Sequence, residues 1–575
     1  MKDNASWIVF TAVTVLLFLY FVFSPVLNYG GDIVEYYGIT ESVLNHGNIN
    51  LTPKDQENIT KTLNPGYFND PQYYIRGVGD NRYPVHFIFY SLLTIPVRLA
   101  LKIFELNELR LFSLTNLLIF SSTIFIVLKY FLKSQAKKLA FLTFIYLSPL
   151  IWFLSWPGPD IYYTSLVLLS IFLFFNKKYI AATILASLAS WHSQPLIVVA
   201  LGFLAYYSLK SIHIYSINEN KHLNITFNKL FRILVLLLLI AVPYLQNYLL
   251  FKVFSPWTIL QNGWTIIYGF GFQNFQFKKL WEMVFDLNIG LLWYSPILMG
   301  GGIYYFIRSM INWKNKIFII ALVIVTAVFY QTNPAWNYGT SGFGPTRHIL
   351  YALPFLIYFI SSNYSSKIIN FVIIGLFIVS QIYIFSFNGF LSPTLSNTFQ
   401  HTPYAKYLLN NFPQFYEPTP EIFVDRTNHN DQEYLYTAVY KTKGICKKAY
   451  VLKSDKKKLI EECGFLPKNY LAKLDDDLSR KANFPRKVIT NEATFWPDPR
   501  SCSQYPPLEL PYVCMKNISD FVNYTGISDI KRISKLPEFP YTGVWKLKLG
   551  LPLRIIVPPG YIIDYNSIEG IYVNF

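Results

Sequence analysis

One stretch near the N-terminus, residues 7–27 with the sequence WIVFTAVTVLLFLYFVFSPVL, decides the class of fold. It carries no charged side chain, and a helix needs about 20 apolar residues to cross the hydrocarbon core of a bilayer. The stretch is too long and too aromatic for a cleaved signal peptide, and no small-residue cleavage site follows it. We therefore expect a retained first membrane-spanning helix over Trp7–Leu27.

The composition supports a membrane protein. Of the 575 residues, 53% are hydrophobic and only 14% are charged, whereas about a quarter of a typical soluble domain is charged. The formal net charge is +17, which in a soluble protein would suggest nucleic acid. In a membrane protein, positive residues gather in the cytoplasmic loops. Membrane lipid is therefore the expected partner, and nucleic acid is not.

Further apolar segments continue the pattern as far as residue 387 and predict a mostly α, polytopic helical bundle of about eleven spans. These segments are Leu111–Tyr130, Leu139–Trp156, Ile161–Phe175, Tyr179–Trp191, Pro195–Leu209, Ile233–Phe251, Ile289–Ile307, Ile317–Tyr330, Ile349–Ile360 and Ile368–Phe387.

The segment Tyr83–Phe104 is apolar, but it carries Pro84, Pro96, Arg98 and Lys102. If it crosses the membrane, the lysine groups at 129–138 and 177–178 fall outside. If it lies on the outer surface as an interfacial helix, they and the later basic loops fall inside, as positive residues prefer. We expect the second arrangement. It makes the chain a multi-pass cell (inner) membrane protein with a cytoplasmic N-terminus and an extracytoplasmic C-terminus.

Two domains are predicted. Residues 1–390 form the transmembrane domain, whose large first outer loop covers about 28–108. Residues 391–575 contain no spanning segment and are expected to form an extracytoplasmic domain of mixed α/β or β-rich structure. Its β-prone runs include Val544–Leu549, Arg554–Val557 and Gly570–Phe575.

All four cysteines lie in this second domain. An even set confined to a hydrophilic domain suggests disulfides and an oxidising compartment. We favour the sequence-local pairing of Cys446 with Cys463 and of Cys502 with Cys514, although other pairings and four unpaired thiols stay open. No spacing of Cys and His indicates zinc.

The acidic stretch GDIVEYY, residues 31–37, directly follows the first predicted span. If it is helical, Asp32, Glu35 and Tyr36 stand at i, i+3 and i+4 and share one face. Ionisable residues at the mouth of a membrane helix are costly, which makes a functional role a reasonable hypothesis. The alternative is a solvated helix cap with no chemistry.

Asp32, Tyr36 and Gly47 resemble in type and spacing the start of the first outer loop in integral-membrane glycosyltransferases of the GT-C superfamily. The similarity is to the family 39-like branch of protein mannosyltransferases and aminoarabinose transferases. This chain has Ile33 where that family often has Glu, and Glu35 lies nearby. Weaker similarities, which extend the resemblance over roughly residues 7–390, occur at Arg82–Pro84, Asn107–Leu111, Pro159–Asp160, Gly290–Pro296 and Arg347–Pro354.

The resemblance implies transfer of a sugar from a polyprenyl-phosphate donor to an acceptor hydroxyl, with inversion, on the outer face. The catalytic candidates are Asp32 as general base, with Glu35 in support. The candidates for binding the donor phosphate are Arg347, Arg82 and His348, because cations stabilise the departing phosphate. The candidates for the substrate pocket are Tyr36 and Asp160. No metal ligands and no certain cofactor are predicted, and dependence on a divalent metal stays open.

Each assignment has a structural alternative. Arg347 can be an interfacial anchor, Arg82 a solvated loop residue and Asp160 a helix N-cap. Two other classes of function also stay open. A polytopic transporter or flippase should show paired halves and midplane charges, and a non-catalytic membrane assembly protein would leave the acidic first loop without a role. The acceptor, whether glycan, lipid or protein, and the sugar itself are not specified.

Overall fold

The structure is a computed structural model of the full chain. The residues that it describes are 4–24, 32–63, 74–78, 81–211, 213–217, 220–224, 227–251, 254, 272, 275–333, 344–365, 367–390, 399–429, 437–452, 456–464, 492–494, 554–556 and 570–574.

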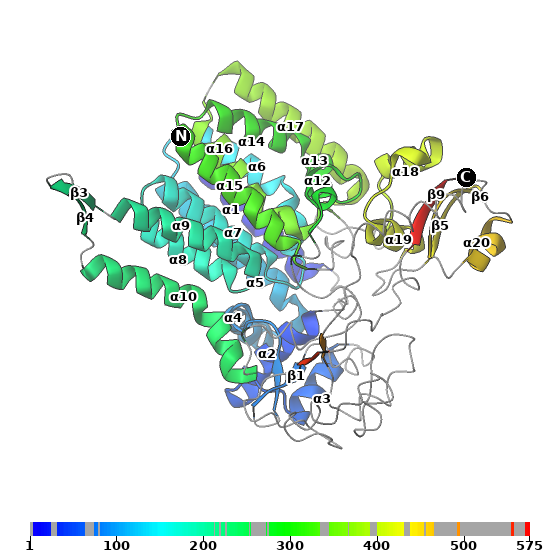
Figure 1. Ribbon diagram of the computed structural model, residues 1–575, viewed down its shortest axis with the longest axis horizontal. Coiled ribbons are helices and arrows are strands. Elements are labelled where there is room, and N and C mark those ends of the chain that lie inside the picture. The colour runs from blue at the N-terminus through cyan, green and yellow to red at the C-terminus, as the bar shows by residue number, and fades with distance from the viewer. Residues whose placement is uncertain are drawn as a thin grey trace.

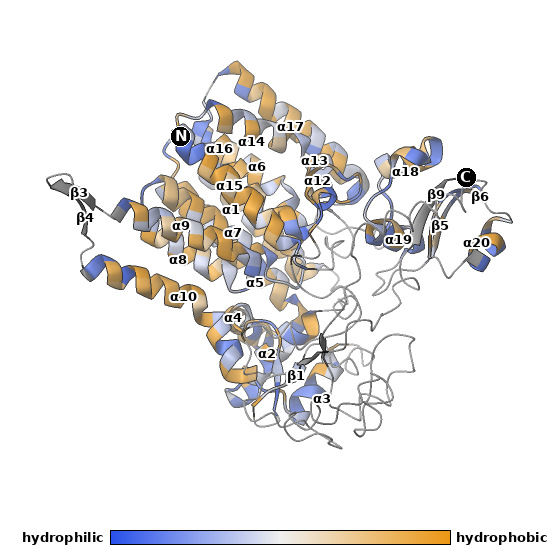
Figure 2. Cartoon of the chain, in the orientation of Figure 1, coloured by the Kyte–Doolittle hydropathy of each residue, from blue (hydrophilic) through white to orange (hydrophobic). Residues whose placement is uncertain are grey.

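The predicted apolar segments are helical and pack into one bundle (Figure 1). Figure 2 shows that these helices are largely hydrophobic along their length. The bundle helices are α1 (Ala5–Phe23), α5 (Leu111–Tyr130), α6 (Gln135–Tyr146), α7 (Asp160–Phe175), α8 (Tyr179–Ser190), α9 (Ile197–Ser211), α10 (Phe227–Phe251), α14 (Pro296–Arg308), α15 (Trp313–Tyr330), α16 (Leu353–Asn363) and α17 (Ile368–Asn388).

Five stretches of helix within the described residues are long and apolar enough to cross a membrane. They are Ala5–Phe23, Glu108–Tyr130, Asn228–Phe251, Trp313–Tyr330 and Ile368–Ser386. Three shorter apolar helices, over Asp160–Phe175, Tyr179–Ser190 and Gln194–Lys210, pack among them. The chain is therefore mostly helical and has the features of a multi-pass membrane protein. The count of about eleven spans and the side of the membrane that each end faces stay predictions.

Two predicted segments are interrupted where a proline falls. Leu139–Trp156 divides into α6 and the 3-10 helix η5 (Pro149–Leu154), and Ile289–Ile307 divides into α13 (Leu291–Tyr294) and α14. Proline lacks a backbone N–H, and it forces the preceding residue out of the helical region. Accordingly, Ser148 before Pro149 is extended, with ψ 162°. Similarly, η6 (Gln194–Leu196) precedes α9 with a proline inside it.

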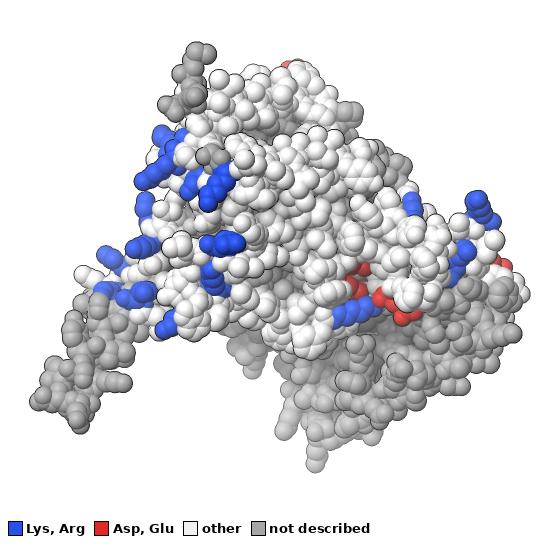
Figure 3. Space-filling model, turned by 90° about the horizontal axis from the view of Figure 1, so that it is seen from above, with Lys and Arg blue, Asp and Glu red and all other residues white. Residues whose placement is uncertain are grey.

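The bundle has a basic end, where successive helices finish and the next ones begin. Three contacts bring these helix ends together: Lys138 lies 5.6 Å from the centre of the Trp7 ring, Lys137 donates to the Ser362 carbonyl, and Tyr206 contacts Asn315. Figure 3 shows the resulting group of Lys and Arg side chains along one edge of the molecule. The basic residues of these helix ends and turns are Lys129, Lys133, Lys137, Lys138, Lys177, Lys178, Lys210, Lys229, Arg232, Arg308, Lys314, Lys316 and Lys367.

The opposite end of the bundle carries a small subdomain from the predicted first loop. It contains α2 (Ile33–His46), α3 (Pro53–Thr62), β1 (Tyr74–Arg76), β2 (Arg82–Pro84), α4 (Phe89–Ile103) and the 3-10 helix η4 (Glu108–Arg110). Strands β1 and β2 pair antiparallel, and α2 packs against α3 and α4. Arg110 ties the subdomain to the end of α1 by donating to the Phe21 carbonyl at 2.6 Å.

Helix α4 corresponds to the segment whose membrane crossing was in question. It is not among the helices long and apolar enough to span. One face is buried against α2, where Arg98 pairs with Glu41 at 2.6 Å and with Glu108 at 2.7 Å. Near its C-terminal end, Ile103 and Phe104 are more than two-thirds exposed. A charged buried face and an exposed apolar end suit an interfacial helix.

The part of the chain after the bundle contains short helices and small sheets. Sheet β5–β6–β9 is antiparallel, and β7 pairs with β8. The elements are α18 (Pro403–Asn411), the 3-10 helix η11 (Pro413–Phe415), α19 (Pro420–Asn428), β5 (Ala438–Thr442), β6 (Ile445–Leu452), α20 (Lys456–Cys463), β7 (Glu492–Thr494), β8 (Arg554–Ile556) and β9 (Gly570–Asn574). The predicted strands at 554–557 and 570–575 are thus confirmed, and 544–549 lies outside the described residues.

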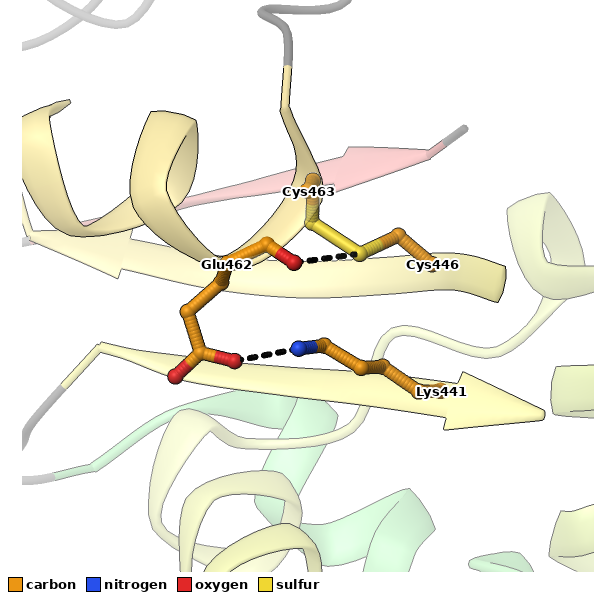
Figure 4. Close-up of a disulfide and its surroundings, with 4 residues drawn as sticks. All are labelled: Lys441, Cys446, Glu462 and Cys463. Carbon is orange, nitrogen blue, oxygen red and sulfur yellow. Dashed lines mark hydrogen bonds and ion pairs between the residues drawn. A yellow bond between two sulfur atoms is a disulfide. The ribbon is translucent and has the colours of Figure 1, made fainter. Parts of the chain in front are cut away.

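A disulfide joins Cys446 on β6 to Cys463 at the end of α20 (Figure 4). Beside it, Lys441 forms an ion pair with Glu462, which links β5 to the same helix. The sequence-local pairing is therefore confirmed for this pair. Cys502 and Cys514 lie outside the described residues.

Three further features connect these parts of the chain. A hairpin of β3 (His213–Ile217) and β4 (Asn220–Asn224) connects α9 to α10. Helix α12 (Phe277–Phe285) precedes α13 and contacts the segment after the bundle through Glu282, which accepts hydrogen bonds from the backbone and hydroxyl of Thr419. Finally, the 3-10 helix η9 (Arg347–Ala352) leads into α16.

Candidate functional site

Asp32 stands at the start of α2, on the far side of the bundle from the basic end. The acidic stretch is helical as predicted, and α2 ends at Gly47, which adopts a left-handed conformation with φ 70°. Asp32 occupies the N-cap position, yet its side chain makes no capping hydrogen bond. Its Oδ2 instead lies 3.9 Å from Nη1 of Arg347. The interpretation of Asp32 as a simple helix cap therefore does not account for its side chain.

Arg347 is the first residue of η9, whose start is fixed by Thr346 accepting the His348 N–H. The Arg347 side chain is 26% exposed, and that of Asp32 is 36% exposed. An ion pair with this much solvent contact stabilises a fold by about 0–1 kcal/mol. The pair thus joins two predicted site residues at the mouth of the bundle without being a major contributor to stability.

Glu35 forms a second, buried pair with His86. Its Oε2 lies 2.6 Å from His86 Nδ1, and its Oε1 accepts the His86 backbone N–H. Burial raises the pKa of Glu35. Burial alone would lower the pKa of His86, but the Glu35 carboxylate outweighs it and raises that pKa to about 9. Both shifts favour a proton on the pair at neutral pH.

This placement bears on the predicted role of Glu35. Its carboxylate is fully buried and faces His86, whereas the carboxylate of Asp32 is partly exposed. The two acids therefore do not present a joint pair of carboxylates to one substrate. Glu35 suits a supporting role toward its histidine.

Tyr36 lies between these two pairs. Its ring centre is 5.3 Å from that of His86 and 5.6 Å from that of Tyr90, and the residue is 2% exposed. Burial, together with the carboxylates of Asp32 and Glu35, raises the pKa of its phenol well above the usual 10. Tyr36 therefore stays neutral and forms an aromatic wall under the site.

Asp160 begins α7 and faces the same region. Its Oδ1 accepts a hydrogen bond from Tyr163 at 2.6 Å, and the Tyr163 hydroxyl also lies 3.5 Å from the Arg347 carbonyl. Its Oδ2 is buried with no hydrogen-bond partner among the described residues. The N-cap position of α7 belongs to Pro159, so the predicted alternative of a capping Asp160 is wrong. Burial raises the pKa of Asp160, the charge of Arg347 opposes this shift, and the charge of Asp32 adds to it.

Two histidines lie deeper. His192, in the turn after α8, accepts the Tyr90 backbone N–H on Nε2 at 2.7 Å. Burial and the neighbouring His86 lower its pKa to about 3. His348 is 3% exposed and stacks against Tyr330, and burial followed by the charges of Arg347 and Lys279 lowers its pKa well below 6.5. Both imidazoles are neutral, so His348 adds no charge for a phosphate.

Arg82 is not drawn into this cluster by any interaction within the described part of the chain. It lies on β2 opposite Arg76, and its carbonyl accepts the Leu51 N–H at 2.9 Å. The structure thus brings the predicted residues Asp32, Tyr36, Asp160 and Arg347 close together, and Glu35 and His348 are buried beside them. Among the residues described, no group of three or more His, Cys, Asp and Glu side chains is arranged to hold a metal ion.

Sequence reasoning missed His86. The available signal was an acid, Glu35, on a helix with many apolar neighbours, and a histidine two residues after Pro84 in the same predicted outer loop. A carboxylate inside an apolar helix face needs a partner, and His86 is the only histidine between Asn81 and Phe104.

No protein-family model, curated protein or solved structure matches this chain.

Proposed function

We propose that the protein is a membrane glycosyltransferase that moves a sugar from a polyprenyl-phosphate donor to an acceptor hydroxyl, with inversion, on the extracytoplasmic face. The observation that carries the proposal is the pairing of Asp32 with Arg347 at the mouth of the bundle, 3.9 Å apart and partly exposed. One group can accept a proton and the other can bind a phosphate, and these are the two functions that such a transfer requires.

The reaction forms one bond and breaks one. The acceptor oxygen attacks the anomeric carbon, the bond between that carbon and the phosphate oxygen breaks, and the polyprenyl phosphate leaves with the electron pair. Asp32 takes the proton of the acceptor hydroxyl as the new bond forms. Arg347 neutralises the charge that develops on the phosphate, for which a planar guanidinium with paired N–H groups is well suited.

The ion pair would hold both side chains in the site before the donor binds. In the structure, the Asp32 carboxylate lies 3.9 Å from the Arg347 guanidinium. A donor phosphate competes for the guanidinium and releases the carboxylate toward the acceptor. Because a pair with this exposure contributes only about 0–1 kcal/mol, separating it costs little compared with a bidentate phosphate contact.

Asp160 and Tyr36 supply the walls of the proposed pocket. The buried, unpartnered Oδ2 of Asp160 can accept a hydrogen bond from a sugar hydroxyl, which would satisfy an atom that is otherwise costly to bury. The ring of Tyr36 is almost fully buried and packs against His86 and Tyr90, so it can support the pocket wall from behind.

The arrangement of the bundle supports the proposed side of the membrane. The cluster lies at the end opposite the basic helix termini, and positive residues are expected on the cytoplasmic side. The Cys446–Cys463 disulfide belongs to the segment that leaves α17, and disulfides persist in oxidising compartments. Localisation in a cell membrane with an extracytoplasmic C-terminal domain is part of the proposal.

The test is transfer from a radiolabelled polyprenyl-phosphate sugar in membranes containing the protein, with glycan, lipid and protein hydroxyls offered as acceptors. Release of polyprenyl phosphate together with label on an acceptor is the expected result. A matched membrane carrying the Asp32→Asn protein provides the background. If the wild type consumes no donor with any acceptor class, the enzyme hypothesis fails and the transporter or assembly protein takes its place.

A further inference from the structure

The site holds a cationic group that the proposed chemistry has not used. His86 carries a carboxylate partner, Glu35, on Nδ1, and its side chain is 18% exposed whereas that of Glu35 is fully buried. The imidazole is therefore the more exposed member of the pair, and it is near enough to Asp32 and Arg347 for their charges to shift its pKa in opposite directions.

We infer that His86 is a second cationic ligand for the phosphate of the donor, and that Glu35 is the positioning residue that keeps it charged and oriented. The inference rests on the proposed function and assigns a role to the two residues on which that function does not depend. It replaces a second catalytic carboxylate with a carboxylate–imidazole pair.

The geometry supports the assignment in two ways. Glu35 contacts His86 twice, at the ring nitrogen and at the backbone N–H, so it fixes both the position and the rotation of the imidazole. Tyr36 packs against the ring from the next position of the same helix. A histidine that donates one N–H to a carboxylate directs its other nitrogen away from that partner, on the opposite edge of the ring.

The electrostatics distinguish His86 from the other histidines of the region. Among the described residues, the groups that face it include Glu35, Asp32, Tyr36, Arg347 and His192. Of these, Glu35 and Asp32 are anionic, and they raise the pKa of His86 against burial. His192 is neutral, with a pKa of about 3, and Tyr36 does not ionise near pH 9. A change in binding between pH 7 and 10 therefore reports on His86.

The chain offers a matched control on the same helix. Glu41 is a second buried acid of α2, and it pairs with Arg98 at 2.6 Å just as Glu35 pairs with His86. Because an arginine stays charged throughout the accessible range, removing the charge of Glu41 should not introduce a titration. Arg98 also keeps Glu108 as a partner at 2.7 Å.

The experiment measures the affinity of the purified full-length protein for farnesyl phosphate between pH 7 and 10. A phosphate monoester is fully ionised above about pH 7, so the probe itself does not titrate. Wild-type affinity should fall with a midpoint near pH 9, the pKa of His86. Glu35→Gln should move the midpoint to the lower limit of this range or below it, toward the ordinary value of about 6.5 for histidine. At pH 8 its affinity should fall on the order of tenfold, the worth of one charge-assisted contact. Glu41→Gln should keep the wild-type midpoint.

A second variant, His86→Gln, controls for a folding defect in Glu35→Gln. His86→Gln keeps a hydrogen-bonding side chain but carries no charge, and it should bind weakly with no midpoint in this range. A midpoint that stays near pH 9 in either variant would overturn the inference. So would a uniform loss of affinity in Glu35→Gln with no shift, because that outcome indicates a purely structural pair.

The remaining outcomes separate the sources of phosphate and the two proposals. Inorganic phosphate should compete far more weakly than farnesyl phosphate, and equal competition would refute a lipid donor as the ligand. If the wild type binds no farnesyl phosphate and transfers no sugar, the proposed function itself is wrong. If the wild type binds and transfers normally but no variant shifts the midpoint, only the role of His86 is wrong.

Discussion

Replacing Asp32 by Asn tests the proposed chemistry most directly, because it keeps the shape of the side chain and removes the charge that accepts a proton. The structure indicates that the cost to stability is small. Asp32 makes no capping hydrogen bond to α2, and its pair with Arg347 is 3.9 Å long and partly exposed on both sides. Such a pair is worth about 0–1 kcal/mol. The variant should therefore fold and insert normally.

The expected effect on the rate is much larger. General base catalysis contributes about 10²–10⁴-fold, which corresponds to roughly 3–5 kcal/mol in the barrier. Transfer from a radiolabelled polyprenyl-phosphate sugar, normalised to the amount of protein in the membrane, should fall by that factor. Affinity for farnesyl phosphate should be kept or improved, because Arg347 loses a competing carboxylate.

Asp55 provides the matched control for a loss of stability. It is a buried acid of the same subdomain that accepts hydrogen bonds from Thr52, Asn45 and His46 and forms the capping box of α3. Asp55→Asn should reduce the melting temperature while leaving turnover per folded molecule close to wild type. Turnover of Asp32→Asn equal to wild type would refute the base assignment. An equal loss of turnover in Asp55→Asn would show that the assay responds to damage in the fold.

Three further predictions follow from the same structure. Arg347→Lys should lose much of the donor affinity, because a point charge does not replace a paired fork, and Arg347→Ala should lose more; wild-type affinity in both, measured with farnesyl phosphate, would leave Arg347 an anchor. Mass spectrometry of the non-reduced protein should recover Cys446 and Cys463 in one linked peptide, and opening that loop should cost on the order of 3 kcal/mol; full alkylation without reductant would contradict this. Cysteines introduced at Lys137 or Lys138 should resist impermeant reagents added outside intact cells, whereas a reporter fused after α17 should be accessible; labelling from outside would reverse the topology.

The helices of the bundle were predictable because a single physical property locates them. A segment that must cross or lie within a bilayer is apolar throughout, so composition alone marked Leu111–Tyr130 with the same bounds as α5 and Ile368–Phe387 within one residue of α17. Other boundaries differ by up to six residues, as at the start of α10, which is Phe227 and not Ile233. Two segments are also interrupted, at Pro149 and Pro296, since proline is compatible with an apolar segment but not with a continuous helix. Hydropathy identifies an apolar segment but does not show whether its helix is continuous.

The site was predictable only along its own helix. The spacing of Asp32, Glu35 and Tyr36 was sufficient to put them on neighbouring turns, and α2 has that form. Their partners come from elsewhere in the chain, because His86 meets Glu35 across 51 positions and Arg347 arrives from the start of η9. No local pattern specifies such contacts. Glu35 and Asp32 look equivalent in the sequence, but in the structure Glu35 is buried and Asp32 is partly exposed. The sequence did not predict this difference.

The distribution of charge through the bundle bears on the choice between an enzyme and a carrier. Transporters commonly hold their substrate near the middle of the membrane with ionisable residues or broken helices. Two helices of this bundle are interrupted, at Pro149 and Pro296, so the comparison rests on charge. In the five candidate spans, no described Asp, Glu, Lys or Arg is buried, and the buried polar residues are side chains such as Asn116, Thr326 and Gln381. The bundle interior is instead packed with aromatic pairs such as Phe174 and Phe203, whose ring centres are 4.5 Å apart.

Charge is concentrated at the two ends, and the two ends differ. One carries lysines over aromatic rings, as Lys138 lies over Trp7, which suits contact with lipid headgroups. The other end holds the pair of Asp32 with Arg347 and the pair of Glu35 with His86, and Asp160 begins α7 beside them. A catalyst whose donor has a lipid tail and whose acceptor is polar needs its reactive groups at the boundary between membrane and water, because each substrate then keeps its preferred solvent while the two reacting atoms meet. If Asp32 is a base and Arg347 a phosphate ligand, as proposed, a carrier has no use for them at the end of the bundle.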